Sequence, residues 1–145
     1  MTVIERTLKR DIQRVDGGEP LGWSLRGLQE SGILCGNVIR DIVVHSIKPS
    51  REKGNHHHLK KTEWFIPIQG RAVLRWHDIS KGHGGEFEIS GESLSNYGQG
   101  SFLVYEIEPR TSHTVMNIDL TEFIIIAVST EDFHQDDTIE CETNV

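Results

Sequence analysis

The chain has 145 residues, enough for one ordinary domain, and its 22 Asp and Glu against 15 Lys and Arg give a formal charge of -7. This acidic balance would repel a nucleic-acid backbone. The longest apolar run, Phe123 to Val128, is too short to span a bilayer, and the charged N-terminus lacks an apolar run of signal-peptide length. We therefore expect a cytoplasmic protein that binds neither nucleic acid nor a membrane.

The two cysteines, Cys35 and Cys141, are far apart in the sequence and form no CxxC motif. Such a motif would be expected of a thiol redox enzyme or of a sulfur-ligated metal site. Because disulfides are rare in the cytoplasm, we expect both cysteines to be free thiols.

The apolar residues mostly follow the two-residue period of strands, and β-branched and aromatic residues are concentrated in short runs. Turn-forming pairs such as Pro49-Ser50 and Gln69-Gly70 separate these runs. Seven short strands at near-regular spacing favour an antiparallel sandwich or barrel. The expected strands are residues 38–47, 62–68, 72–78, 85–89, 102–107, 113–118 and 122–129.

The two ends of the chain are expected to lie outside the barrel. We predict a single domain over residues 1–145, divided into parts 1–36, 37–130 and 131–145. The first part, interrupted by glycines, should supply a short strand and a covering loop in which Trp23 and Leu25 pack. The acidic last part should form a short helix or an extended arm that Phe133 and Ile139 anchor.

A run of three histidines points to a metal site. If His56 lies on a strand, alternation of side chains places His56 and His58 on one face and His57 on the other. Glu63 begins the next expected strand, and His113 would come from a distant segment. Three imidazoles and one carboxylate suit zinc, iron, manganese, nickel or copper, with positions left for water or substrate. The sequence therefore predicts a metal site with these four ligands.

Other residues near these histidines are expected to be structural. A lone histidine on a strand is usually an ordinary surface or core residue, and aromatic residues on strands are usually core. We expect surface positions for His77, His83 and His134, and core positions for Trp64, Phe65 and Trp76.

The order and spacing of these residues resemble the two motifs of the cupin superfamily. The first motif is met by His56, His58, Glu63 and Gly70, and the second by Gly100, Pro109, His113 and Asn117. The second motif departs from the common form, because Thr111 stands where a glycine is usual and the gap before Pro109 is longer. The resemblance implies an all-β fold, the cupin-type double-stranded β-helix or jelly-roll barrel.

Within the cupins, the chain resembles the C-terminal epimerase domain of bifunctional capsular polysaccharide enzymes that epimerise and reduce UDP-sugars. The matching stretches are residues 36–41, Lys48-Pro49, residues 54–58, residues 61–63, and residues 111–113 with Asn117. This resemblance implies a bound zinc and C3 epimerisation of a 4-keto sugar nucleotide in polysaccharide biosynthesis. The chain has no GxGxxG fingerprint, so only the epimerase half is expected.

Epimerisation next to a keto group needs a base, an acid and a cation near the carbonyl oxygen. The catalytic candidates that are not metal ligands are His57, Lys60, Lys61 and Tyr105, with His45 as a further one. Three arginines, Arg40, Arg75 and Arg110, are available for a diphosphate.

Two other functions stay open. The same four ligands could hold iron in a metal-dependent dioxygenase, or the barrel could bind carbohydrate without catalysis. Zinc is the expected metal, with iron, manganese or nickel as alternatives, and a nucleotide sugar is the expected small-molecule partner. Because an unpaired strand edge is often covered by a second copy, we expect a homodimer, with residues 2–15 as the segment that could be exchanged.

Overall fold

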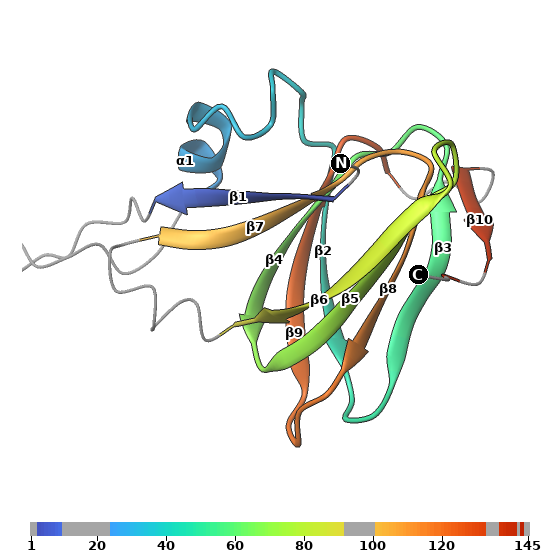
Figure 1. Ribbon diagram of the computed structural model, residues 1–145. Coiled ribbons are helices and arrows are strands. Elements are labelled where there is room, and N and C mark those ends of the chain that lie inside the picture. Colours follow the sequence, from blue (N-terminus) through green and yellow to red (C-terminus); the bar gives the residue numbers. More distant parts are fainter. Residues whose placement is uncertain (1–2, 10–23, 92–100, 133–136, 142, 144–145) are drawn as a thin grey trace, which may run out of the picture.

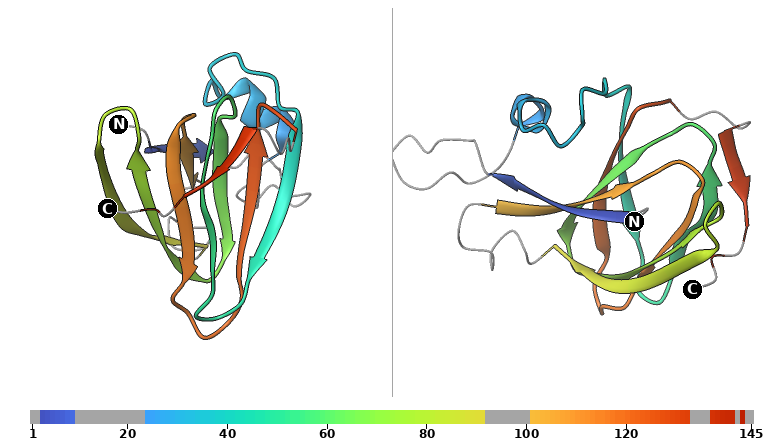
Figure 2. Two further views of the ribbon diagram at one scale, coloured as in Figure 1. Left: turned by 90° about the vertical axis from the view of Figure 1, so that its right-hand side faces the viewer. Right: turned by 45° about the horizontal axis from the view of Figure 1, so that its top comes forward.

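The computed structural model describes residues 3–9, 24–91, 101–132, 137–141 and 143, and these form two five-stranded antiparallel sheets (Figure 1). The first sheet has the order β1 (Val3–Lys9), β7 (Ser101–Ile107), β4 (Glu63–Gln69), β9 (Phe123–Ser129) and β2 (Asp41–Ile47). The second has the order β10 (Thr138–Glu140), β3 (Glu52–His58), β8 (Thr111–Asn117), β5 (Arg71–Asp78) and β6 (His83–Ser90). The two sheets enclose a barrel (Figure 2), which confirms the predicted all-β jelly-roll fold.

The main core fills the space between the sheets. On β5, Ala72, Leu74 and Trp76 are buried and alternate with more exposed neighbours, as expected for a strand with one face in the core. On β9, Phe123 and Ile125 are buried in the same cluster. Because burial of one large apolar side chain is worth about 1.5–3 kcal/mol, this cluster stabilises the contact between the two sheets.

A second apolar cluster lies on the outer face of the first sheet, under α1 (Leu25–Glu30). Ser24 caps the helix by accepting a hydrogen bond from Gly27 N at 3.0 Å, and Leu28 packs against a cluster that includes Trp64 of β4. Trp64 Nε1 also donates to Glu106 at 2.9 Å. Among the described residues, no helix is long and apolar enough to span a membrane.

All seven expected strands overlap an observed strand, but β3 was not among them. Its sequence, EKGNHHH, lacks alternating apolar residues, so its position is set by pairing with β8 and not by a hydrophobic pattern. The short strand expected near the N-terminus is β1, while α1 occupies part of the expected covering loop.

At the C-terminus, the extended alternative is found, because residues 138–140 form β10 and not a helix. The prediction that Ile139 anchors this segment was wrong, since the side chain is 39% exposed. Three further predictions concern Trp23, Phe133 and the side chain of Leu25, all of which lie outside the described part of the chain.

Candidate metal centre

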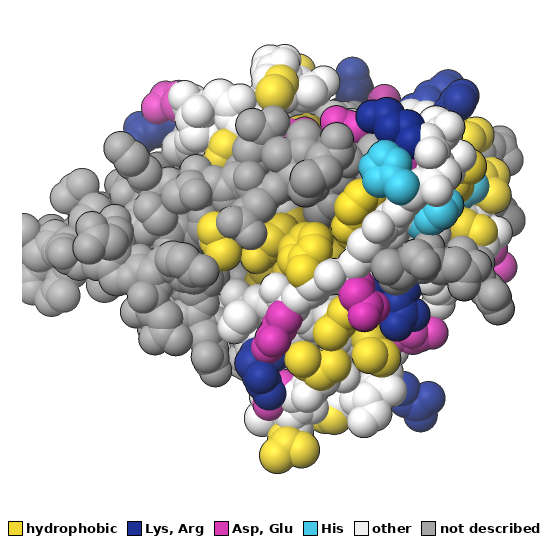
Figure 3. Space-filling model, in the orientation of Figure 1, with side chains coloured by type: hydrophobic (Ala, Val, Ile, Leu, Met, Phe, Trp, Pro, Cys, Tyr) yellow, Lys and Arg dark blue, Asp and Glu magenta, His cyan; other side chains and the backbone are white. Residues whose placement is uncertain are grey.

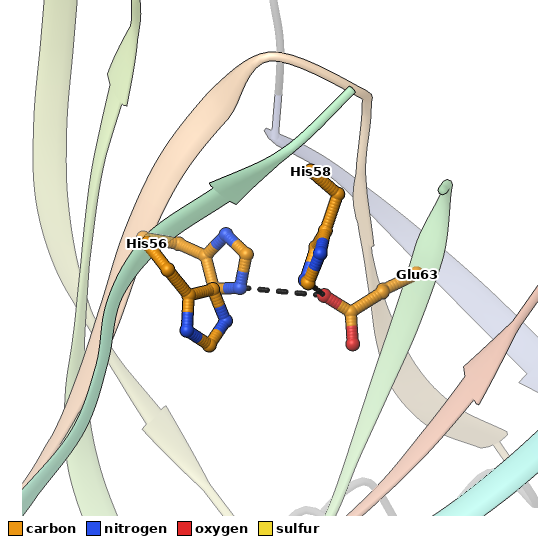
Figure 4. Close-up of side chains that lie close together, drawn as sticks. His56, His58 and Glu63 are labelled. Atoms are coloured by element: carbon orange, nitrogen blue, oxygen red, sulfur yellow. Dashed lines mark ion pairs between the residues drawn. The ribbon is translucent and has the colours of Figure 1, made fainter. Parts of the chain in front are cut away.

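The four residues predicted as metal ligands lie together inside the barrel. His56 and His58 come from β3, Glu63 from the start of β4 and His113 from β8, and their ligand atoms all lie within 4.8 Å of one another. In Figure 4, the side chains of His56, His58 and Glu63 extend into the same space, with His58 pointing at Glu63. His58, Glu63 and His113 are buried, and His56 is half-buried. The second sheet thus provides three imidazoles, and the first sheet provides the carboxylate.

A bulge in β3 aims the histidines inward. The register between β3 and β8 runs from Gly54 opposite Thr114 to His56 opposite His113, which leaves Asn55 as an extra residue. Gly54 and Asn55 adopt φ values of +127° and +54°. On the outer side, Asn55 N donates to Thr114 Oγ1 at 2.8 Å, and the same hydroxyl donates to Asn55 Oδ1 at 2.7 Å. The bulge is therefore held by side-chain hydrogen bonds.

One oxygen of Glu63 faces two imidazoles. Oε1 lies 2.9 Å from His58 Nε2 and 3.3 Å from His113 Nε2. Burial raises the pKa of Glu63, but the imidazoles of His113 and His58 beside its carboxylate outweigh burial and hold this pKa well below its usual value. The carboxyl group is therefore ionised at neutral pH.

The hydrogen bond on the far side of His113 fixes which nitrogen is free to bind a metal. Its Nδ1 lies 2.9 Å from Thr111 O, and because a carbonyl can only accept, Nδ1 carries the proton. In the neutral ring, the lone pair of Nε2 then points toward the anionic Glu63, whose Oε1 accepts no hydrogen bond of good geometry. Imidazole and carboxylate lone pairs that converge in a buried space are a donor set that fits a divalent metal ion.

His56 completes this group as a neutral imidazole. Its ring centroid lies 4.8 Å from those of both His58 and His113. Burial, followed by the nearby His113 and His58, lowers the pKa of His56 from 6.5 to about 3. Because a metal binds the unprotonated ring, this environment suits a ligand at neutral pH.

A cavity of about 370 Å³ is lined by three of the four residues, His56, His58 and Glu63. Its wall includes three other basic side chains from β2, β3 and the residues before β4, namely His45, Lys53 and Lys61. Lys61 is only 7% exposed, and no ion pair or hydrogen bond is found for its ammonium group within the described residues. Burial and the nearby Lys53 lower the pKa of His45. The remaining polar lining comes from Asp41, Ser129 and Thr138.

The four catalytic candidates lie in different places. Lys61 lines the cavity, whereas His57 points to Cys141, with 3.5 Å between Nδ1 and Sγ. Lys60 is exposed. Tyr105 is buried in the main core, where its ring centroid lies 5.4 Å from that of Phe87. The structure therefore brings one of the four to the cavity and places the other three elsewhere.

The arginines proposed for a diphosphate are also separated from one another. Arg75 Nε lies 3.2 Å from Glu86 Oε2 on an outer face over β5 and β6, where acidic and basic side chains gather (Figure 3). Arg40 and Arg110 are exposed. Arg40 precedes Asp41 in the sequence, and its backbone N donates to Ser129 O. Both Asp41 and Ser129 line the cavity, so Arg40 lies next to the cavity wall.

Several structural predictions are confirmed. Cys35 and Cys141 are free thiols, and His83 is exposed. Trp64, Phe65 and Trp76 are core residues. His77 is half-buried, so the prediction that it is a surface residue is confirmed only in part. His134 and Gly100 lie outside the described residues.

Sequence reasoning missed part of the cavity wall. Asp41 and Val43 share the inward face of β2 with His45, and alternation along that expected strand could have identified them. Lys53 could not be found in this way, because the bulge at Asn55 changes which side chains of β3 face inward.

Comparison with solved structures identifies relatives of this fold. CapF, a capsular polysaccharide assembling protein from Staphylococcus aureus, has 27% identity and a TM-score of 0.61 over 70% of this chain, which spans only 28% of CapF. A dTDP sugar isomerase from Desulfovibrio desulfuricans has 13% identity and a TM-score of 0.68, with 97% of this chain and 85% of that one covered. The dTDP-6-deoxy-D-glucose-3,5-epimerase RmlC from Legionella pneumophila has 12% identity and a TM-score of 0.67, with 94% and 71% covered.

No match to a curated protein sequence was found. A family model, the polysaccharide biosynthesis C-terminal domain, matches residues 36–139, a range that includes all four clustered residues. The predicted resemblance to a capsular polysaccharide cupin is therefore confirmed. The chain belongs to the polysaccharide biosynthesis C-terminal domain family.

Proposed function

We propose that this chain is an enzyme that epimerises or isomerises a nucleotide-activated keto sugar in polysaccharide biosynthesis. The metal would be a divalent ion, with zinc expected, bound by His56, His58, Glu63 and His113. Support comes from the family and from the similar folds of two enzymes named for dTDP-linked sugars, a dTDP sugar isomerase and a 3,5-epimerase. C3 epimerisation of a 4-keto sugar nucleotide is the specific reaction that we propose.

The observation that carries this proposal is the cavity lined by His56, His58 and Glu63. Its volume of about 370 Å³ lies within the range of small-molecule sites. Groups that could move a proton or bind an oxygen atom line it beside His56, His58 and Glu63. A purely structural metal site would need no such cavity, because its ligands close around the ion.

The reaction begins with removal of a proton from the carbon next to the keto group. The C–H bond breaks, a base on one face takes the proton, the electron pair moves into an enolate, and a proton from water on the opposite face forms the new C–H bond of the epimer. A bound divalent cation would polarise the keto oxygen and so lower the barrier to this step.

The lining residues suggest how the protein itself contributes. We assign proton removal to His45, because its lowered pKa keeps the imidazole neutral and able to accept a proton at neutral pH. We assign binding of the enolate oxygen to Lys61, whose side chain is largely buried and lines the cavity. His57, Lys60 and Tyr105 stay candidates with less support, since none of them lines this cavity.

The test is exchange of solvent deuterium into the sugar. Metal-loaded protein is incubated in D₂O with UDP- and dTDP-linked 4-keto-6-deoxyhexoses, and deuterium at C3 is measured by NMR. We expect exchange in the wild type, loss of about 10²-fold or more in His45→Gln, as for removal of a general base, and no loss in the exposed control His83→Gln.

Other outcomes would point elsewhere. Exchange that is unchanged in His45→Gln would contradict the role of His45 but not the reaction. If the protein contains iron and consumes oxygen, the dioxygenase alternative replaces this proposal. Binding of the sugar nucleotide without exchange would favour a carbohydrate-binding protein without catalysis.

We also propose that the protein acts as a cytoplasmic homodimer with a single cupin domain. In this chain, residues 3–9 of the segment expected to exchange pair with β7 of the same chain. Light scattering coupled to size-exclusion chromatography measures the oligomeric state, and a monomer at micromolar concentration would contradict the dimer.

A further inference from the structure

The strand β10 lies directly beside the segment that carries two of the proposed ligands. In its antiparallel register, Thr138 is opposite His58, Ile139 is opposite His57 and Glu140 is opposite His56. The sequence suggested a short helix or an extended acidic arm here. The described structure instead places residues 137–141 and 143 along the strand of the candidate metal centre.

Hydrogen bonds fix this C-terminal segment before and after β10. At its start, Asp137 Oδ1 accepts from Lys60 N at 2.8 Å, and Asp137 O accepts from Leu59 N at 3.2 Å. Beyond its end, Cys141 N donates to Asn55 O at 2.8 Å. The segment is therefore attached to β3 both before and after the histidines.

The last described residue, Thr143, is attached to β8. Its buried hydroxyl lies 2.6 Å from Ser112 Oγ and 3.2 Å from Thr114 Oγ1. Ser112 and Thr114 flank His113, whose side chain points the other way, into the barrel. The C-terminal segment thus contacts both strands that carry the proposed histidine ligands.

One side chain of this segment reaches a ligand itself. Thr138 Oγ1 lies 3.3 Å from His58 Nδ1, while the other ring nitrogen of His58 lies 2.9 Å from Glu63 Oε1. A hydrogen bond from Nδ1–H to a neighbouring oxygen orients the ring and leaves Nε2 free to bind a metal. Thr111 O already does this for His113.

We propose that Thr138 is a positioning residue for the metal centre, orienting His58 by accepting a hydrogen bond from its Nδ1–H. The C-terminal segment then serves as part of the metal site and not as a peripheral arm. This inference rests on the metal assignment of the proposed function, but it does not depend on which substrate the cavity accepts.

The experiment compares metal affinity in Thr138→Val, which keeps the shape of the side chain but removes the hydroxyl, with Thr138→Ser, which keeps the hydroxyl. Zinc affinity is measured by competition with a chromophoric chelator, and Co²⁺ absorption reports the coordination geometry. We expect a 10- to 100-fold loss of affinity and an altered Co²⁺ spectrum in the valine variant, as for other partners of metal-bound histidines, and near-wild-type values in the serine variant.

Glu140→Gln is the matched control, because Glu140 is an exposed residue of the same strand and should leave the affinity unchanged. Thermal unfolding of the metal-free proteins separates orientation of His58 from simple detachment of β10. Equal affinity in the valine variant and the wild type overturns the inference, as does an equal loss in the valine and serine variants. A wild type that binds no metal overturns both this inference and the metal assignment, whereas metal binding without sugar exchange contradicts the proposed reaction alone.

Discussion

The backbone of Gly54 packs so closely against that of His113 that a Cβ atom at position 54 would lie 2.5 Å from the His113 carbonyl oxygen. Real Cβ atoms do not approach an oxygen so closely, so only glycine fits there. This contact holds β3 against β8 at the bulge that places His56 opposite His113.

Gly54→Ala should therefore disturb both the fold and the metal centre. The added methyl group meets backbone atoms that cannot rotate away, and φ at this position is +127°. We expect the free energy of unfolding to fall by about 2–4 kcal/mol, and zinc affinity to fall with it. Gly82→Ala is the control, because Gly82 also has a positive φ but open space around it, so only about 1–2 kcal/mol of backbone strain is expected. Urea unfolding measures both, and equal effects would contradict a role for the contact with His113.

Removal of proposed ligands should abolish metal binding. Elemental analysis of protein purified without a histidine tag should give about one zinc ion per chain in the wild type, as expected for one site with four ligands. The double variant His56→Ala, His58→Ala should contain none, and Glu63→Gln should bind at least about 10²-fold more weakly because the anionic ligand is lost. The exposed His83→Ala should keep its metal. A wild type without metal after zinc supplementation would refute the ligand assignment.

Acid should destabilise the metal-free protein below about pH 6.5. The pKa of His56 is about 3 in the folded protein and 6.5 ordinarily, so the unfolded chain takes up a proton over this interval while the folded chain does not. The free energy of unfolding therefore falls as the pH falls from 6.5 toward 3, and the lowered pKa of Glu63 adds to this loss below its usual value of 4.5.

Thermal unfolding of chelator-treated protein between pH 8 and pH 5 measures this dependence. His56→Asn should reduce it, because one group that titrates only in the unfolded chain has been removed, while the lowered pKa of His45 still contributes. A wild type with the same stability at pH 8 and pH 5 would contradict the depressed pKa of His56.

Asn117 should matter for the fold and not as a metal ligand. Its Nδ2 donates to Ile47 O and Thr121 O, each at 2.8 Å, and its Oδ1 accepts from Asp119 N at 2.8 Å. Asn117→Ala leaves these buried or half-buried groups without partners, so a loss of about 2–4 kcal/mol in the free energy of unfolding is expected. Metal affinity of the folded variant, measured by chelator competition below its unfolding temperature, should change less than threefold. A large loss of affinity would indicate a direct role at the centre.

The sequence was sufficient to predict that these four residues lie together, because the spacing of the residues reflects the fold. His56 and His58 face the same way by strand alternation, and Glu63 follows on the next strand, as predicted. The residues of the same motifs that do not face the centre have structural roles. Gly70, for example, adopts φ +85° in the turn between β4 and β5, and Asn117 joins β8 to the end of β2.

What could not be predicted depends on contacts between segments far apart in the chain. The strand β3 has no apolar pattern of its own, and the bulge at Asn55 brings Lys53 to the cavity against simple alternation. The direction of His57 toward Cys141 depends on the pairing of β10 with β3, across more than eighty residues of sequence. Local patterns carry no information about such pairings.

The division of the four clustered residues between the sheets links metal loading to folding. His56, His58 and His113 belong to the second sheet, and Glu63 begins a strand of the first. An ion bound by all four would act as a cross-link between the two walls of the barrel, and at a free concentration 100 times its dissociation constant it would add about 2.7 kcal/mol to the free energy of unfolding. The melting temperature would then rise with the concentration of free metal, so the supply of metal in a cell would set how much of this protein remains folded.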